Sequence, residues 1–188
     1  MLRIAVIYFS ATEATHSLAL AIREGASGTG VAEVFSHRIR GTEIEHGRFR
    51  NGECLELADS ADAVIFGSPT YMGGPAAEFK AFADASGSRW EKQHWAGKVA
   101  AGFTVGANPN GDQLATLQYF SILAAQQGML WVGLDIAGGY DPLGRNRLGT
   151  QLGLAVHCIS PLPDESDIAT AKHLGARVAT VARRVCQR

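Results

Sequence analysis

Charged residues are scarce in this sequence, and no long hydrophobic run occurs in it. Lys and Arg together number 17, Asp and Glu number 18, and the formal net charge of the 188 residues is -1. A nucleic-acid-binding protein usually carries a basic excess, so this balance argues against nucleic acid as a partner. The apolar runs stay far below the ~18 residues of a membrane-spanning helix. The segment after Met1 is also too short for the core of a signal peptide, so we expect a cytoplasmic protein.

Cysteine is equally scarce, and only Cys54, Cys158 and Cys186 are present. Their odd number and wide spacing disfavour a disulfide framework and a zinc site, so we expect small buried side chains in a reducing compartment. The six histidines show no metal-ligand spacing either, and no bound metal is predicted. Glycine, by contrast, is frequent, and its 22 residues predict tight turns and close backbone approach to a ligand.

Short apolar runs alternate along the chain with segments of helical periodicity. Runs without polar alternation are typical of strands that are buried on both faces of a parallel sheet. We predict five strands, at residues 4–9, 31–35, 63–67, 98–105 and 129–134. Helices are expected around residues 18–25, 55–61, 75–87, 112–127 and 165–185. This alternation predicts one three-layer α/β domain over residues 1–188, with a doubly wound parallel sheet.

A long glycine-rich segment at about 135–155 interrupts the alternation and is predicted to be an insertion, after which residues 154–159 resume the fifth strand. Three other loops of unusual composition follow the first, third and fourth strands, at residues 10–15, 69–74 and 106–111. The carboxyl ends of parallel strands meet at one edge of the sheet, where α/β proteins bind their ligands. We therefore predict a binding site formed by these three loops.

The first loop places three hydroxyls, those of Ser10, Thr12 and Thr15, around the start of a helix. Unpaired N–H groups and a partial positive charge at a helix start favour an anion such as phosphate. No Lys or Arg occurs between Arg3 and Arg23, so neutral donors would hold the phosphate. Helix capping is the alternative, although capping needs only one hydroxyl. No G-x-G-x-x-G or Walker sequence is present, which argues against a Rossmann dinucleotide site and a P-loop.

The second loop combines Pro69, Tyr71 and two glycines. The glycines would let the backbone approach a ligand, and Tyr71 would stack on a flat ring. A tight turn with a surface tyrosine explains the same residues equally well. The third loop, 106–111, offers exposed backbone N–H groups and is a weak signal by itself. Asp59 and Asp62 lie at the opposite end of the predicted sheet, so capping or solvation is favoured over a catalytic carboxylate pair.

The sequences of these loops resemble those of the flavodoxin-like FMN proteins, and more closely those of the WrbA-type NAD(P)H:quinone oxidoreductases. The resemblance covers nearly the whole chain. Residues 10–15 are similar to the family's FMN-phosphate loop. Residues 67–74 resemble its Gly-Thr-Pro-Thr-Arg-Phe-Gly-Asn stretch, which contacts the isoalloxazine ring, and residues 104–113 occupy the place of the loop on the other side of the flavin. The resemblance implies a flavodoxin-like fold with the strand order 2-1-3-4-5.

The resemblance implies an FMN-dependent oxidoreductase that transfers electrons from NADH or NADPH to a quinone-like acceptor, in a homodimer or homotetramer. A flavodoxin-type electron carrier without NAD(P)H oxidase activity is the main alternative, and a reductase that supplies free flavin is another. The cofactor carries the chemistry in such proteins, so no catalytic side chain is predicted. The predicted cofactor-binding residues are Ser10, Ala11, Thr12, Glu13, Ala14, Thr15, Pro69, Thr70, Tyr71, Met72, Gly73, Gly74, Thr104, Val105, Gly106, Ala107, Asn108 and Gly111.

The sequence also departs from the family pattern. Glu13 replaces a glycine and places a carboxylate beside the expected phosphate, and Pro109 removes one backbone donor from the third loop. Tyr71 and Met72 stand in place of Arg-Phe, so a charged partner of the ring is missing. Residues 124–129 align with a family His-His-Gly-Met, which makes Gln127, in place of a histidine, the substrate-site candidate. Two tryptophans, Trp90 and Trp95, are expected in a loop where they could contact a partner subunit.

Overall fold

A parallel sheet forms the centre of the computed structural model, which describes residues 1–160 and 162–186. Its main strands lie in the order β2-β1-β5-β7-β8, and their bounds are Ala32–Ile39, Leu2–Phe9, Ala63–Tyr71, Val99–Gly106 and Leu130–Trp131. β9 (Leu154–His157) pairs with the carboxyl half of β7, on the edge where β8 pairs with its amino half. The fifth strand is thus split into β8 and β9, and the flavodoxin-like order is confirmed.

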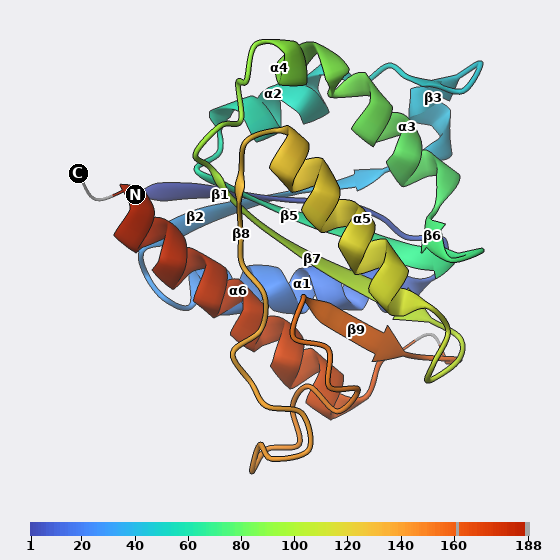
Figure 1. Ribbon diagram of the computed structural model, residues 1–188, viewed down its shortest axis with the longest axis vertical. Helices are drawn as coiled ribbons and strands as arrows, with labels where there is room; N and C mark the ends of the chain where they lie inside the picture. The colour runs from blue at the N-terminus through green and yellow to red at the C-terminus, as the bar shows by residue number, and fades with distance from the viewer. Residues whose placement is uncertain (161, 187–188) are drawn as a thin grey trace.

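Helices cover both faces of the sheet (Figure 1). α1 (Glu13–Ser27) and α6 (Glu165–Cys186) lie on one face, and the other face carries α2 (Gly52–Ser60), α3 (Ala77–Ala85), α4 (Gly87–Glu91) and α5 (Gln113–Gln126). Successive strand residues point to opposite faces. Ile4 and Val6 therefore join the core beneath α1 and α6, while Ala5 and Ile7 join the core beneath the other helices. Burial on both faces explains why the strands are unbroken apolar runs.

Two glycines let α1 and α6 pack against each other without a gap. A Cβ atom on Gly25 would lie 1.9 Å from the carbonyl oxygen of Lys172, and one on Gly175 would lie 2.0 Å from that of Ile22. Both distances are far below van der Waals contact and involve backbone atoms, which cannot rotate out of the way. Alanine at either position would therefore push the two helices apart.

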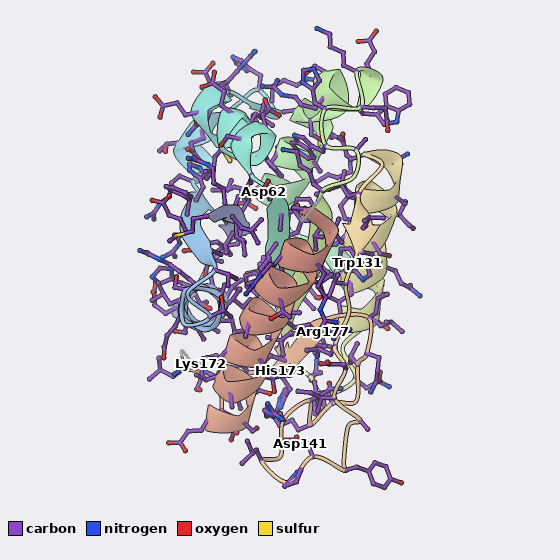
Figure 2. The ribbon with its side chains drawn as sticks, turned by 90° about the vertical axis from the view of Figure 1, so that its left-hand side faces the viewer. Asp62, Trp131, Asp141, Lys172, His173 and Arg177 are labelled. Atoms are coloured by element: carbon purple, nitrogen blue, oxygen red, sulfur yellow. The ribbon has the colours of Figure 1, made fainter. Side chains whose placement is uncertain are left out.

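The segment between β8 and β9 is tied to α6 by charged side chains (Figure 2). Asp135 accepts from His173 Nε2 at 2.6 Å and from Arg177 Nη1 at 2.6 Å. Arg147 donates from Nε and Nη2 to the two carboxylate oxygens of Asp167, at 2.9 and 2.7 Å. The insertion is thus fixed to the helix that follows it.

The structure extends several predicted strands. β2 continues to Ile39, and β5 continues to Tyr71 because it forms a hairpin with β6 (Gly74–Pro75). Between the predicted second strand and the predicted helix at 55–61, the chain forms a short 3₁₀ helix, Gly41–Glu43, and a small hairpin of β3 (Ile44–Glu45) and β4 (Arg48–Phe49). The β3–β4 and β5–β6 pairings are local hairpins, whereas the extension of β2 depends on its pairing with β1. Within residues 1–160 and 162–186, no helix has the length and apolar character to cross a membrane.

Two expectations about single side chains are wrong. Trp95 is fully buried, because its ring packs beside Phe82 and its Nε1 donates to Asp59 Oδ1 at 2.7 Å. It is therefore not free to contact a partner, whereas Trp90 is exposed. Of the three cysteines, only Cys54 is a buried side chain; Cys158 is half-buried and Cys186 is exposed.

Candidate functional site

A cavity of about 440 Å³ lies at the carboxyl edge of the sheet. Its walls come from the start of α1, the ends of β5 and β7, and Cys158, Ile159 and Ser160 after β9. Eight of the eighteen predicted cofactor-binding residues line it: Thr12, Thr15, Pro69, Thr70, Tyr71, Val105, Gly106 and Ala107. None of the lining residues is charged, so a phosphate here meets only neutral side chains.

The first loop offers free donors to this cavity. Ser10 is buried and serves the loop itself, because its Oγ accepts the His16 N–H at 3.0 Å and also bonds the Thr12 carbonyl. Thr12 is the N-cap residue of α1, yet its side chain makes no capping bond. The Thr15 side chain lines the cavity, is 2% exposed, and makes no hydrogen bond within the described residues. Capping therefore explains Ser10 alone, and the Thr15 hydroxyl beside a helix start fits a phosphate.

The carboxylate of Glu13 turns away from the cavity. It pairs with Arg38 Nη1 at 3.2 Å, and Arg38 Nη2 donates to the Ser10 carbonyl at 2.9 Å. Arg38 stands at the end of β2, in register with Tyr8 of β1, which brings it to the loop edge of the sheet. Sequence reasoning missed it, because the predicted second strand ends before this residue. Arg38 offsets the negative charge that Glu13 brings to the loop.

Tyr8 lies beneath the first loop. Its hydroxyl and His16 Nδ1 are 2.6 Å apart, and the two rings are stacked. Burial raises the pKa of Tyr8 above its usual value, although nearby Arg38 and Arg40 oppose the effect. The phenol therefore stays protonated and uncharged, and its hydrogen bond with His16 supports the loop.

The second loop is a hairpin with a two-residue turn. Thr70 pairs with Pro75 and Tyr71 with Gly74, and the turn residues Met72 and Gly73 have φ values of 48° and 75°. Positive φ at both turn residues is the signature of a type I′ turn, which matches strand twist. The Tyr71 side chain, 49% exposed, lines the cavity, whereas Met72 projects fully into solvent. Gly73 and Gly74 shape the turn and lie outside the cavity wall.

The third loop is held by the buried side chain of Gln113. Its Nε2 donates to the Asn108 carbonyl at 2.7 Å, and its Oε1 accepts the Gly111 N–H at 2.8 Å. A Cβ atom on Gly106 would lie 2.5 Å from Gln113 Nε2, so glycine is needed there. Asn108 and Gly111 therefore maintain the loop, and Gly106 and Ala107 face the cavity.

Three threonine hydroxyls meet at the floor of the site. Thr70 Oγ1 lies 2.8 Å from Thr104 Oγ1 of β7 and 2.8 Å from Thr116 Oγ1 of α5. Thr104 and Thr116 are fully buried, while Thr70 is half-buried and lines the cavity. Thr104 was among the predicted residues, but Thr116 was not. Its position within a helix carries no sequence signal of a site.

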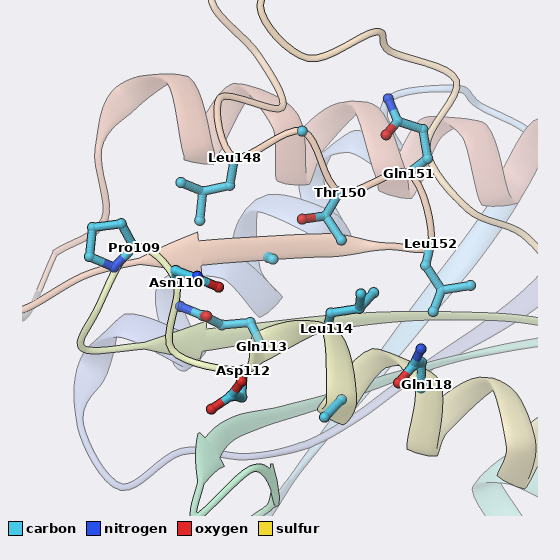
Figure 3. Close-up of a pocket in the computed structure, with 13 residues that line it drawn as sticks. Pro109, Asn110, Asp112, Gln113, Leu114, Gln118, Leu148, Thr150, Gln151 and Leu152 are labelled. Carbon is cyan, nitrogen blue, oxygen red and sulfur yellow. The ribbon is translucent and has the colours of Figure 1, made fainter.

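A larger cavity of about 620 Å³ lies on the far side of the third loop, between α5 and residues 148–152 (Figure 3). Asn110, Gln113, Gln118 and Gln151 give it a lining rich in amide groups. Its only charged lining residue is Asp112, whose carboxylate disfavours an anion. The smaller cavity beside α1 is therefore the better fit for a phosphorylated flavin.

The placement of Gln127 requires a correction. Its side chain is 1% exposed and its Nε2 donates to the Ser86 carbonyl and Oγ, at 3.1 and 2.9 Å. Gln127 follows α5, beside Gly97 and the start of β7, which is the edge of the sheet opposite the cavity. Its side chain therefore cannot touch a ligand in the cavity of the same chain. Its Oε1 is the one buried polar side-chain atom without a partner in the described part of the chain.

A comparison with known protein families identifies the family of the chain. A model of the NADPH-dependent FMN reductase family matches residues 7–138, which is well over half of the chain and includes the three loops. The chain belongs to the NADPH-dependent FMN reductase family. It is an NAD(P)H-dependent oxidoreductase with FMN as its cofactor.

Individual relatives cover the chain from end to end. A protein named NAD(P)H dehydrogenase (quinone) from Archaeoglobus fulgidus is 36% identical over 200 residues, which cover 99% of this chain and 100% of that protein. Flavodoxin FldP from Pseudomonas aeruginosa is 33% identical over 193 residues, with 98% and 99% covered. The solved flavodoxin, WrbA-like protein from Agrobacterium tumefaciens matches with a TM-score of 0.75 and 38% identity over 98% of this chain and 99% of that one. The predicted WrbA-type resemblance is confirmed.

Proposed function

We propose that this protein transfers electrons from NAD(P)H through FMN to a small quinone, and that FMN binds in the 440 Å³ cavity. The observation that carries the proposal is the uncharged cavity at the carboxyl edge, with a helix start at one end and the Thr15 hydroxyl, which makes no hydrogen bond within the described residues, facing the cavity. When bound, FMN supplies hydride acceptance and electron transfer. The chain's own residues bind and orient the cofactor.

Each wall of the cavity has a role in this proposal. The N–H groups at the start of α1, with the hydroxyls of Thr12 and Thr15, hold the phosphate. Tyr71 on one side and Gly106 on the other flank the flat ring, since both line the cavity and one provides an aromatic surface and the other exposed backbone. Thr70 supplies a hydroxyl to the ring from below.

The side chains at the rim of the cavity indicate the chemical class of the electron acceptor. Tyr71 is 49% exposed and Ile159 is exposed as well, and both line the cavity, so its mouth carries apolar surface. No lining residue carries a charge that would select an acidic or basic acceptor. Neutral planar molecules with an apolar body and carbonyl oxygens suit such a mouth, and quinones have this chemistry. The relative from Archaeoglobus fulgidus, named as a quinone dehydrogenase, supports the same acceptor class.

Steady-state oxidation of NADH and NADPH by the FMN-loaded protein tests this function. We expect rapid oxidation that depends on added benzoquinone, with the quinol formed in a one-to-one ratio to the nicotinamide consumed. A protein that binds FMN but oxidises neither nicotinamide, with or without benzoquinone, would overturn the proposal.

An electron carrier is the second candidate, and the relative named Flavodoxin FldP favours it. A carrier would accept electrons from a reductase protein and would not oxidise NAD(P)H by itself. The same assay, repeated with a flavodoxin reductase added, separates the two functions. A third candidate function is that of a reductase that supplies free flavin. Gel filtration after turnover distinguishes it, because such a reductase would lose its FMN while the proposed enzyme would keep it.

We further propose that the active form is a homo-oligomer. Leu114 and Ile122 on α5, together with Trp90 after α3, are large apolar side chains left exposed in the single chain. Exposed apolar side chains of this size are typical of interfaces between subunits. Light scattering at micromolar concentration should give a dimer or tetramer of the 19.9 kDa chain. A strict monomer would contradict the proposal.

A further inference from the structure

The three threonines at the floor of the cavity share a hydrogen-bond network with a defined direction. Thr70 Oγ1 lies at its centre, 2.8 Å from each of the other two hydroxyl oxygens. Neither Thr104 nor Thr116 has a further side-chain hydrogen bond within residues 1–160 and 162–186. The three residues come from β7, α5 and β5, so the fold itself brings them together.

The direction follows from counting protons. Each hydroxyl has one proton to donate and two lone pairs. Thr104 and Thr116 are fully buried, and a buried hydroxyl proton without an acceptor is costly. Among the described residues, Thr70 Oγ1 is the only side-chain partner of each hydroxyl, so both protons point at Thr70. That arrangement fills both lone pairs of Thr70 Oγ1 and leaves its own proton without a partner in the network.

We infer that Thr104 and Thr116 fix the Thr70 hydroxyl as a donor directed into the cavity, where it selects an acceptor atom of the bound ring. This inference rests on the proposed location of FMN. The ligand chemistry it selects is a carbonyl oxygen or an unprotonated ring nitrogen, both of which the oxidised isoalloxazine edge presents. Thr70 cannot accept a bond from a ligand N–H group, because both of its lone pairs are occupied. Thr104 and Thr116 are therefore positioning residues that act through Thr70.

Four variants test the inference: Thr70→Val, Thr116→Val, their double variant, and Thr116→Ser, which restores the hydroxyl. Thr180→Val is the matched control, since Thr180 is an exposed residue of α6 whose hydroxyl bonds only its own helix. Affinity for FMN and riboflavin is measured by quenching of flavin fluorescence, and the midpoint potential of bound FMN by equilibration with a redox dye. No turnover with quinone is required.

We expect Thr70→Val to weaken FMN and riboflavin equally, by about two- to tenfold, which is the factor for one neutral hydrogen bond. Thr116→Val should shift the midpoint potential, Thr116→Ser should leave it near the wild-type value, and Thr180→Val should change nothing. Because Thr116 acts through Thr70, adding Thr116→Val to Thr70→Val should have no further effect. Independent, multiplying effects of the two substitutions would overturn the inference, as would a Thr116→Val potential equal to that of the control.

Two outcomes keep this test separate from the proposed function. A protein that binds FMN and responds as expected but reduces no quinone would overturn the acceptor while the threonine network stands. Unchanged flavin affinity in Thr70→Val, with FMN binding lost in Thr15→Val, would overturn the network and leave the cofactor site in place. If Thr70→Val fails to fold, the Thr104→Val/Thr116→Val variant removes both donors, leaves the Thr70 hydroxyl in the cavity wall and creates no buried hydroxyl without an acceptor. It should shift the potential more than Thr116→Val, and an unshifted potential would refute the inference.

Discussion

Substitution of Thr15 by valine is the sharpest test of the phosphate end of the cavity. Valine has the shape of threonine and lacks the hydroxyl. The Thr15 side chain is 2% exposed, lies in the first turn of α1, and makes no hydrogen bond within the described part of the chain. The substitution therefore removes no contact of the apoprotein, and its effect on stability should be small.

Its effect on FMN should be large. A hydrogen bond to a charged group contributes roughly 1.5 to 3 kcal/mol. Each 1.4 kcal/mol is a factor of ten in a binding constant, so FMN affinity should fall on the order of tenfold to a hundredfold. The lining of the cavity holds no Lys or Arg side chain that could take over the bond.

Titration with two flavins distinguishes a phosphate contact from a structural role. Riboflavin has the same ring without the phosphate, and Thr15→Val should leave its affinity nearly unchanged. Thr180→Val is again the matched control, and both variants should unfold at the same temperature as the wild type. Equal loss of FMN and riboflavin binding in Thr15→Val would show that the phosphate lies elsewhere and would refute the reasoning.

Further predictions concern the charged groups. Arg38→Met should weaken FMN binding severalfold at low salt by leaving Glu13 unpaired beside the phosphate, and Glu13→Gln should strengthen it slightly; salt should shrink both effects in titrations. Arg147→Met strips the buried Asp167 of its partner and should cost about 3 to 5 kcal/mol in urea unfolding. Burial raises the pKa of Asp167, so its contribution to stability falls as pH rises through that pKa. A protonated Asp167 is neutral and needs no partner, so the stability lost in Arg147→Met should be smaller at about pH 4 than at about pH 7. Lys98→Met should destabilise by about 2 kcal/mol in the same assay, because the Lys98 ammonium donates to three backbone carbonyls at the end of α2.

The central strands were predictable because burial on both faces leaves an unbroken apolar run in the sequence. β2 lies at the edge of the sheet, and its second half carries the exposed Ser36 and the partly buried His37 and Arg38. Polar residues in an edge strand look like loop residues, so the predicted strand stopped at Phe35. The continuation of β5 to Tyr71 was missed for a different reason, because the added residues pair with β7 and, across a turn, with β6.

The candidate site was predictable where it consists of loops and not where it depends on contacts across the fold. Parallel strands bring their carboxyl ends together, so the loops after the first, third and fourth strands had to meet. Arg38 and Thr116 reach the site through strand register and helix packing, which no local pattern encodes. Gln127 failed for the opposite reason: alignment to a family histidine gave it a role, whereas the direction of α5 places it at the other edge of the sheet.

The proposed hydrogen bonds at the two ends of the cavity differ in strength, because one acceptor is charged and the other is neutral. Replacing threonine by valine at each end distinguishes the two contacts. At the phosphate end, Thr15 adds a bond to a charged oxygen, so Thr15→Val should discriminate strongly between FMN and riboflavin. At the ring end, Thr70 adds a bond to a neutral acceptor, so Thr70→Val should weaken both flavins alike and more modestly. Both residues line the same cavity, and both substitutions remove one hydroxyl. A common pattern for the two variants would therefore show that the flavin does not lie between α1 and β5 in the proposed direction.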